Sequence, residues 1–194
     1  MRVVGGMWRG KPLEAPEGRA VTRPTTDRVR ESIASMVLSA CDLDLSGMYV
    51  LDAFAGSGAL GIEMLSRGAS HTTFVDTDRT TIRLIKKNLA QVGASPASFT
   101  VLASDSFSCA TNPAFRAHPF NLVLLDPPYV ITSAQVAEML HALYTNEALA
   151  PKALVVYERA AKTPELSLDF AHALKQKRYG TTCVDVLRVE RSHE

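Results

Sequence analysis

The chain has 194 residues, 46% of them hydrophobic and 21% charged, and its net charge is +1. These values are ordinary for one globular domain whose core is large enough to fold without disulfides or metal ions. No apolar run reaches the roughly 18 residues that indicate a transmembrane helix, and the small net charge argues against a strong general nucleic-acid binder.

The first 30 residues carry the positive charge of the chain. They hold seven basic and three acidic side chains, a local charge of +4. Two short strands, Arg2–Val4 and Lys11–Leu13, are expected to pair here as a hairpin. We therefore divide the chain into a basic N-terminal β-hairpin extension, residues 1–24, and a main domain, residues 25–194. A basic arm on a nearly neutral body is typical of a surface that contacts phosphates.

From residue 26 onward, helical and strand patterns alternate. Thr26 or Asp27 caps the first predicted helix, which ends at Ala40. The predicted helices cover 27–40, 58–66, 78–91 and 133–144, and the predicted strands cover 49–51, 72–75, 99–102, 121–125, 153–157, 173–178 and 182–188. This alternation indicates an open α/β sheet with right-handed crossovers. An antiparallel hairpin is expected at the C-terminal end of the chain.

Carboxylates stand at the ends of three predicted strands. Asp52, Asp76 and Asp126 each follow an apolar segment, and Asp105 lies shortly after a fourth strand. The carboxyl ends of parallel strands meet at one edge of a sheet, where α/β proteins bind their ligands. Burying unpaired carboxylates is costly, so this arrangement indicates a binding site.

A glycine-rich loop, Asp-Ala-Phe-Ala-Gly-Ser-Gly-Ala-Leu-Gly, occupies residues 52–61. Its G-x-G-x-x-G spacing, with Asp76 twenty residues after Gly56, also fits a dinucleotide-binding loop. Asp52 would repel a pyrophosphate but suits the amino group of S-adenosylmethionine, and no Tyr-x-x-x-Lys pair of a short-chain reductase is present. The predicted cofactor-binding residues are Asp52, Phe54, Ala55, Gly56, Ser57, Gly58, Asp76, Thr77, Asp105 and Ser106.

Each part of this set has an expected role. Gly56 and Gly58 let the main chain approach the methionine part of the cofactor. Asp76 can accept hydrogen bonds from both ribose hydroxyls. Asp105 and Ser106 can contact the adenine amine, although Asp105 is equally suited to cap a helix.

The sequence Asp126-Pro127-Pro128-Tyr129 follows the fourth apolar strand. Methylation of an exocyclic amine needs two fixed acceptors for its N–H groups, and the Asp126 carboxylate and the Pro127 carbonyl are suited to that role. The two prolines fix the main chain. Tyr129 can stack on a base that has left its helix. These four residues are the predicted catalytic set.

The loop of residues 52–61 together with Asp126–Tyr129 resembles the amino-group methyltransferases of the Rossmann-like class I fold, a seven-stranded, mostly parallel sheet with helices on both faces. Residues 22–31 and the opening Gly6–Gly10 resemble the RsmD-like enzymes, which methylate guanine N2 in the 16S ribosomal RNA of bacteria. The resemblance implies S-adenosylmethionine as cofactor and small-subunit ribosomal RNA as partner. The implied RNA-contacting residues are Arg2, Arg9, Lys11, Arg23, Arg28 and Arg30.

The near-neutral charge suits RNA that is already folded within a small-subunit particle. Three alternatives stay open: a DNA adenine-N6 or cytosine-N4 methyltransferase, a ribosome-assembly factor that retains the fold without catalysis, and a Rossmann oxidoreductase. The DNA alternative shares Asp126–Tyr129 but lacks a large target-recognition domain.

The three cysteines, Cys41, Cys109 and Cys183, are far apart and form no C-x-x-C pair. We expect neither a disulfide nor a metal site. Reduced thiols fit a cytoplasmic protein, and one compact domain makes a monomer the expected state.

Overall fold

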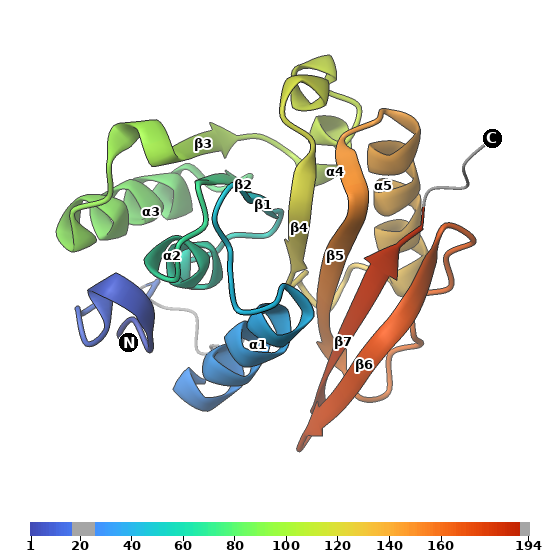
Figure 1. Cartoon of the computed structure of the whole chain (residues 1–194), viewed down its shortest axis with the longest axis horizontal. Coiled ribbons are helices and arrows are strands. Elements are labelled where there is room, and N and C mark those ends of the chain that lie inside the picture. The colour runs from blue at the N-terminus through green and yellow to red at the C-terminus, as the bar shows by residue number, and fades with distance from the viewer. Residues whose placement is uncertain (17–25, 191–194) are drawn as a thin grey trace.

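The structure is a computed structural model that describes residues 1–16 and 26–190. Its seven-stranded sheet has the order β3-β2-β1-β4-β5-β7-β6. Strands β1 to β5 pair in parallel, and β7 is antiparallel to both β5 and β6. The bounds are β1 Tyr49–Asp52, β2 His71–Asp76, β3 Phe99–Ala103, β4 Phe120–Leu125, β5 Leu149–Ala160, β6 Ala171–Tyr179 and β7 Thr182–Val189. The predicted sheet with its C-terminal hairpin is confirmed (Figure 1).

The main helices begin where the sequence offers a capping side chain. Thr26 caps α1, Asp78 caps α3, and Thr132 forms a capping box with Gln135 at the start of α5. The helices are α1 Asp27–Ala40, α2 Ala59–Ser66, α3 Arg79–Val92, α4 Ser106–Cys109 and α5 Ser133–Thr145. Within the described ranges, no helix combines the length and apolar character needed to cross a membrane.

Strand β4 lies at the centre of the core and is covered on both faces. Leu122 and Leu124 pack in the cluster that α1 covers, whereas Val123 and Leu125 pack in the cluster that α5 covers. All four side chains are 0–1% exposed. Because successive side chains of a strand point to opposite faces, this continuous apolar run matches a strand buried between two layers.

The N-terminal segment, residues 1–16, forms the predicted hairpin only as a short, irregular pairing. Arg2 and Pro12 form an isolated antiparallel bridge, flanked by backbone hydrogen bonds from the Val3 N–H to the Lys11 carbonyl at 3.0 Å and from the Leu13 N–H to the Met1 carbonyl at 2.9 Å. Residues Gly6–Trp8 between them form a short 3-10 helix. The predicted antiparallel pairing of Arg2–Val4 with Lys11–Leu13 is therefore confirmed, although neither segment forms a regular strand. The reason is tertiary, because the backbone donors that a longer hairpin would use are instead bound by side chains of α2.

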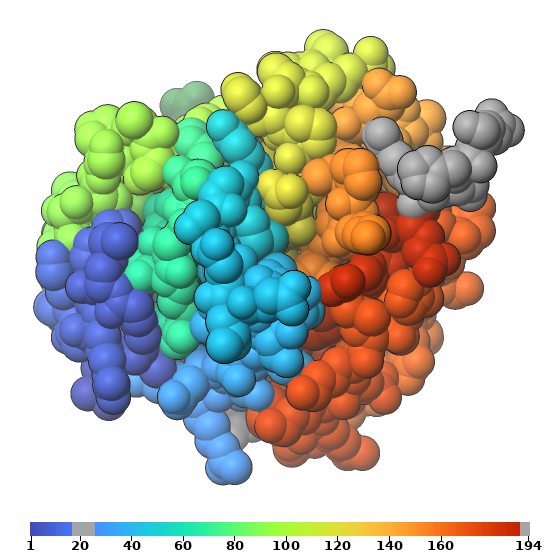
Figure 2. Space-filling model, viewed as in Figure 1, coloured from blue at the N-terminus to red at the C-terminus, as the bar shows by residue number. Residues whose placement is uncertain are grey.

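Glu63 and Ser66 of α2 hold this segment. The buried Glu63 carboxylate accepts hydrogen bonds from the backbone N–H groups of Val4 and Gly5, both at 2.8 Å. The Ser66 hydroxyl donates to the Gly5 carbonyl at 2.6 Å and accepts from the Trp8 N–H. Figure 2 shows the segment, in blue, directly against the green residues of the region that holds α2 and α3. Val3 and Leu13 share a buried cluster with these two helices. The proposed boundary at residues 24 and 25 lies outside the described residues.

Candidate active site

A cavity of about 690 Å³ opens at the carboxyl ends of the parallel strands. Strand order reverses between the neighbouring strands β1 and β4. From β1 the chain adds β2 and β3 toward one edge of the sheet, and from β4 it adds β5, β7 and β6 toward the other edge. Such a switch point is where open α/β sheets bind ligands. The Asp52, Asp76 and Asp126 residues predicted at strand ends all line this cavity, so the structure brings them together as expected.

The glycine loop joins β1 to α2 and forms one wall. Gly56 and Gly58 have φ angles of +54° and +76°, which side-chain-bearing residues rarely adopt. A Cβ built on Gly56 would meet no atom within 4 Å, so the glycine leaves open space beside the loop. Gly61 has a different role, because a Cβ there would lie 2.3 Å from the Phe74 ring. Because Gly61 has no Cβ, α2 can pack closely on β2.

The Asp76 carboxylate holds the glycine loop in place and also lines the cavity. Its two carboxylate oxygens accept hydrogen bonds from the backbone N–H groups of Gly56 at 3.0 Å and Asp78 at 2.9 Å. Each oxygen keeps further acceptor capacity. A carboxylate held in this way at the end of the second strand suits a pair of ribose hydroxyls. Thr77, beside it, also lines the cavity.

Asp52 is a buried carboxyl, 3% exposed, at the end of β1. Its Oδ2 accepts a hydrogen bond from the Gly61 N–H in the first turn of α2, at 3.0 Å. Burial raises the pKa of Asp52 to about 7; the Gly61 hydrogen bond opposes this rise, and the Asp126 and Asp76 carboxylates add to it. A cationic group in the cavity would stabilise the ionised form of this carboxyl.

Asp105 and Ser106 follow β3 and line the same cavity, but their side chains are engaged. Asp105 caps α4, with Oδ2 accepting from the Ser108 N–H at 3.0 Å. The Ser106 hydroxyl donates a short hydrogen bond to the Ala53 carbonyl. The capping alternative for Asp105 is thus confirmed, and the Ser106 hydroxyl supports the glycine loop.

Phe107 is a cavity residue that sequence reasoning missed. Its ring meets the predicted Phe54 ring edge to face, with centroids 6.1 Å apart, and both line the cavity. The pair forms an apolar wall suited to a planar heterocycle. The sequence offers a weak signal, an aromatic residue two positions after an acid at a strand end.

Asp126–Tyr129 connects β4 to α5 at the cavity mouth. All four residues line the cavity, and the Tyr129 side chain is 69% exposed. The Ile131 N–H donates to the Pro128 carbonyl at 2.9 Å, which closes a turn before the α5 cap. The motif is therefore anchored by a buried strand on one side and a capped helix on the other, with Tyr129 presented to solvent.

Five of the six predicted RNA-contacting residues fall into three groups. Arg28 is exposed at the start of α1 and lines the cavity, and Arg9 is exposed on the N-terminal segment. Arg2 lies 3.4 Å from the Asp27 carboxylate, and the Lys11 ammonium donates to the Val92 carbonyl, at the end of α3, at 2.7 Å. Arg23 lies outside the described residues.

Arg30 differs from the other predicted RNA-contacting residues because it is buried. Its side chain is 2% exposed, and its guanidinium donates to the Arg2 carbonyl at 2.8 Å and to the Asp27 carboxylate at 2.5 Å. A guanidinium held in this way joins the N-terminal segment to α1, and Arg30 also lines the cavity; its contact with RNA stays a prediction. The resemblance implied an RNA contact for Arg30, and its burial between α1 and the N-terminal segment was not predicted.

The far wall of the cavity was not predicted at all. It comprises the end of β5 and the turn between β6 and β7, with the residues Tyr157, Glu158, Arg159, Ala160, Thr163, Arg178, Tyr179, Gly180 and Thr182. Arg159 is buried and pairs with the buried Asp185 of β7 at 2.6 Å. This ion pair holds β5 and β7 together beside the cavity. Within the described part of the chain, no group of acidic, histidine and cysteine side chains is arranged to hold a metal ion.

Fold and site together define a methyltransferase of the Rossmann-like class I type, the class that takes S-adenosylmethionine as methyl donor. Its particular place within that class follows from comparison with known proteins. The family described as Conserved hypothetical protein 95 matches residues 1–188, and the chain belongs to this family.

Relatives with assigned names support the same placement. The chain is 34% identical over 180 residues to Ribosomal RNA small subunit methyltransferase D of Haemophilus influenzae, covering 93% of this chain and 89% of that protein. It is 37% identical over 158 residues to the protein of the same name from Escherichia coli strain K12, covering 81% and 74%. The resemblance to the RsmD-like enzymes is thereby confirmed.

A solved structure agrees in fold across the whole chain. The Escherichia coli protein titled "Putative methyltransferase yhhF" superposes with a TM-score of 0.84 at 29% identity, covering 99% of each chain. The similarity therefore extends to the N-terminal segment and the C-terminal hairpin as well as to the glycine loop.

Proposed function

We propose that this protein transfers a methyl group from S-adenosylmethionine to the exocyclic N2 amine of a guanine in small-subunit ribosomal RNA. One observation carries the proposal: Asp126–Tyr129 and the glycine loop with Asp76 line the same cavity. The names of the relatives support ribosomal RNA as the substrate. An exocyclic amine of a base is the methylation substrate that needs two fixed hydrogen-bond acceptors, one for each of its N–H groups.

The residues at hand fit the cofactor. Gly56 leaves open space beside the loop, Asp76 offers acceptors for the ribose, and Phe54 with Phe107 flanks a planar ring. The buried Asp52 offers a carboxylate to an amino group. The bound cofactor supplies an electrophilic methyl on its sulfonium.

Asp126 and Pro127 orient the amine. The Asp126 carboxylate and the Pro127 carbonyl each accept an N–H hydrogen bond, so that the nitrogen lone pair turns out of conjugation and toward the methyl group. Prolines at 127 and 128 fix the main chain before substrate arrives, which avoids reorganisation during the reaction. The exposed Tyr129 ring stacks on the base after it leaves its helix.

The test uses small-subunit particles and transcribed small-subunit ribosomal RNA that lack the modification. Wild-type protein and labelled S-adenosylmethionine should place label in the RNA, and the mass and fragmentation of the isolated nucleoside should match N2-methylguanosine. Asp126→Asn should lower kcat about 100-fold, since a preorganised acceptor is lost. Its affinity for S-adenosylhomocysteine, measured by calorimetry, should stay within about twofold of wild type.

Other outcomes contradict the proposal in specific ways. A parallel assay offers unmethylated duplex DNA, and label confined to that DNA, with N6-methyladenine or N4-methylcytosine in the digest, would assign the alternative substrate. A different RNA nucleoside would keep the substrate and overturn the N2 specificity. Full activity of Asp126→Asn would remove the motif from the chemistry.

A further inference from the structure

The turn between β6 and β7 forms part of the cavity wall but has no role in the chemistry proposed above. Strand β6 is the outermost strand of the sheet, and residues 172–178 of this strand are exposed. Arg178, Tyr179 and Gly180, at its end, line the cavity together with Asp126–Tyr129. A surface that runs from the sheet edge into the cavity mouth is therefore continuous with the candidate active site.

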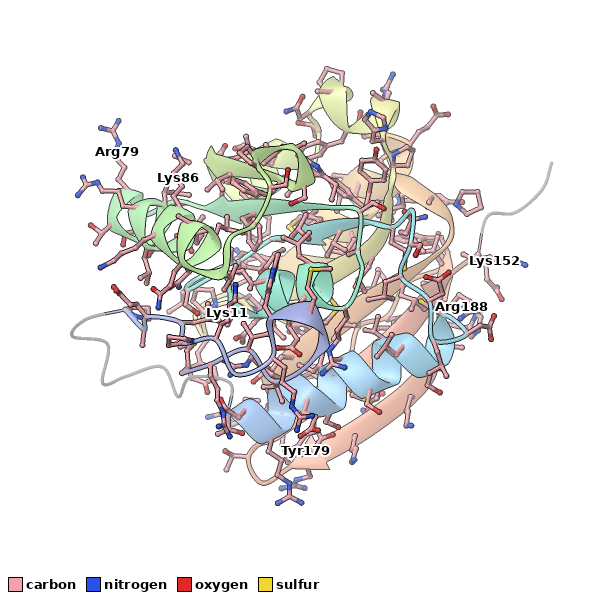
Figure 3. The ribbon with its side chains drawn as sticks, turned by 60° about the vertical axis from the view of Figure 1, so that its left-hand side comes forward. Lys11, Arg79, Lys86, Lys152, Tyr179 and Arg188 are labelled. Carbon is pink, nitrogen blue, oxygen red and sulfur yellow. The ribbon has the colours of Figure 1, made fainter. Side chains whose placement is uncertain are left out.

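The tip of this hairpin is fixed in place. The Tyr179 hydroxyl shares a short hydrogen bond with the Ser32 hydroxyl of α1, which ties the tip to the helix that carries Arg28. The Arg178 Nε donates to the Gly180 carbonyl at 2.9 Å. That bond orients the guanidinium and uses only its Nε–H group. Figure 3 shows Tyr179 beside α1, on the other side of the molecule from Arg79 and Lys86 of α3.

The charge of β6 is basic along its length. Lys175, Lys177 and Arg178 are exposed, and β6 contains no acidic residue. Within residues 1–16 and 26–190, none of these three side chains has a carboxylate within 4.0 Å of its charged nitrogen. The Lys177 ammonium lies 5.2 Å from the centre of the Tyr179 ring. The strand therefore offers cations whose charge is not neutralised by an adjacent carboxylate.

The spacing of the cations suits a polyanion in extended form. Lys175 and Lys177 are two residues apart on one face of β6, which places them about 6.7 Å apart along the strand. Lysines on an edge strand also prevent edge-to-edge association. That role alone, however, does not account for Arg178, which lies at the cavity mouth with its guanidinium oriented by the turn.

We propose that the β6–β7 hairpin binds the phosphates of the RNA strand next to the target nucleotide, with Arg178 at the cavity mouth and Lys177 and Lys175 further along β6. This inference rests on the proposed RNA substrate. Arg28 on α1 and Arg178 on the hairpin then contact the backbone on two sides of the flipped base. Phosphate contacts of this kind set register and carry no base specificity.

The experiment compares charge removal on the hairpin with charge removal elsewhere. Arg178→Ala and the double variant Lys175→Ala with Lys177→Ala are assayed on unmodified small-subunit particles over a range of salt concentrations. Arg79→Ala and Lys86→Ala serve as matched controls, because they remove exposed cations of α3 far from the hairpin. Calorimetry with S-adenosylhomocysteine verifies that each variant keeps its cofactor site.

Arg178→Ala should raise KM for the particles about tenfold with kcat nearly unchanged, and should make the slope of log(kcat/KM) against log[salt] less steep by about one. Arg178→Lys should retain the slope. The α3 controls should match wild type in both quantities. A KM and slope for Arg178→Ala equal to those of the controls would overturn the inference, as would a loss confined to kcat. Failure of the wild-type protein to methylate RNA would instead overturn the proposed function.

Discussion

At the scale of single residues, Asp52 is the group whose chemistry depends most on its surroundings. Burial raises its pKa to about 7, so the carboxyl is half protonated near pH 7 and becomes largely protonated about one pH unit lower. If the cofactor's amino group binds the ionised form, complex formation lowers the pKa of Asp52 and releases a proton. Affinity should then rise with pH through about 7 and level off above it, and below 7 it should fall by up to about tenfold per pH unit.

Calorimetry with S-adenosylhomocysteine in two buffers of different ionisation enthalpy measures the proton release directly. Adenosine, which has no amino acid group, provides the control and should show no release in this range. Asp52→Asn should abolish the pH dependence. An affinity that stays constant between pH 6 and 8, with no net proton exchange, would exclude the assigned contact.

Single residues also show where sequence patterns succeed and where they fail. Asp52, Asp76 and Asp126 were predictable because strand ends converge at one sheet edge whatever the details of packing. The burial of Arg30 was not predictable, since the inward direction of its side chain depends on hydrogen bonds to the Arg2 carbonyl and the Asp27 carboxylate. Phe107 was missed because an apolar residue after a strand has no local feature that separates a cavity wall from a core.

At the scale of secondary-structure elements, the attachment of the N-terminal segment to α2 is a testable feature. Glu63→Gln keeps the size of the side chain but replaces one acceptor oxygen with an N–H donor that faces the backbone N–H groups of Val4 or Gly5. It also removes the ion pair with Arg67 at 2.8 Å. Leaving buried polar groups without partners should lower the free energy of unfolding by about 2–3 kcal/mol.

Urea denaturation of both proteins gives this free energy. Glu138→Gln, an exposed position on α5, is the matched control and should change stability by less than about 0.5 kcal/mol. Equal stability of Glu63→Gln and wild type would show that the segment does not depend on this carboxylate.

Among the elements, periodic segments were predicted well and short ones were not. The long helices and all seven strands appear close to their expected places. The four-residue α4 and the 3-10 turn Pro113–Ala117 were missed, because one turn of helix is too short to show a period. Strand β5 begins earlier than expected, at Leu149. Pro151 and Lys152, the latter with a φ of +62°, interrupt its pattern where the register with β4 shifts.

At the scale of the whole molecule, the charge distribution predicts how the substrate is recognised. The net charge is +1, and two exposed arginines, Arg28 and Arg178, line the cavity. A few phosphate contacts give a salt slope of roughly −3 for binding. We expect kcat/KM to be higher for assembled small-subunit particles than for naked small-subunit RNA, because folded RNA presents its phosphates already arranged.

Parallel assays on transcribed RNA and on particles, at the same salt concentrations, measure kcat/KM and its salt slope for each substrate. A heat-unfolded and rapidly cooled RNA sample controls for folding of the naked substrate. An equal or higher kcat/KM on naked RNA would show that recognition needs no assembled particle.

The composition of the whole cavity could not be read from the sequence. The glycine loop and Asp126–Tyr129 were identifiable as motifs. The third wall, formed by β5 and the β6–β7 turn, depends on antiparallel pairing between Val155 and Leu187 and their neighbours. Local patterns specify a hairpin there but do not specify which strand it joins or which end of the sheet it reaches.

The reversal of strand order between β1 and β4 separates two tasks along the sheet. The residues proposed to hold the methyl donor lie at or after the ends of β1, β2 and β3, whereas Asp126–Tyr129 and the hairpin residues proposed to hold the acceptor lie after β4 and on β6. Arg28, on α1, is the exception among the proposed RNA contacts. A sequence change in the acceptor half can therefore alter the molecule that is methylated while the donor half stays intact. The same division makes the β6–β7 hairpin the place at which the register of the RNA strand could be shifted while the binding of the methyl donor stays unchanged.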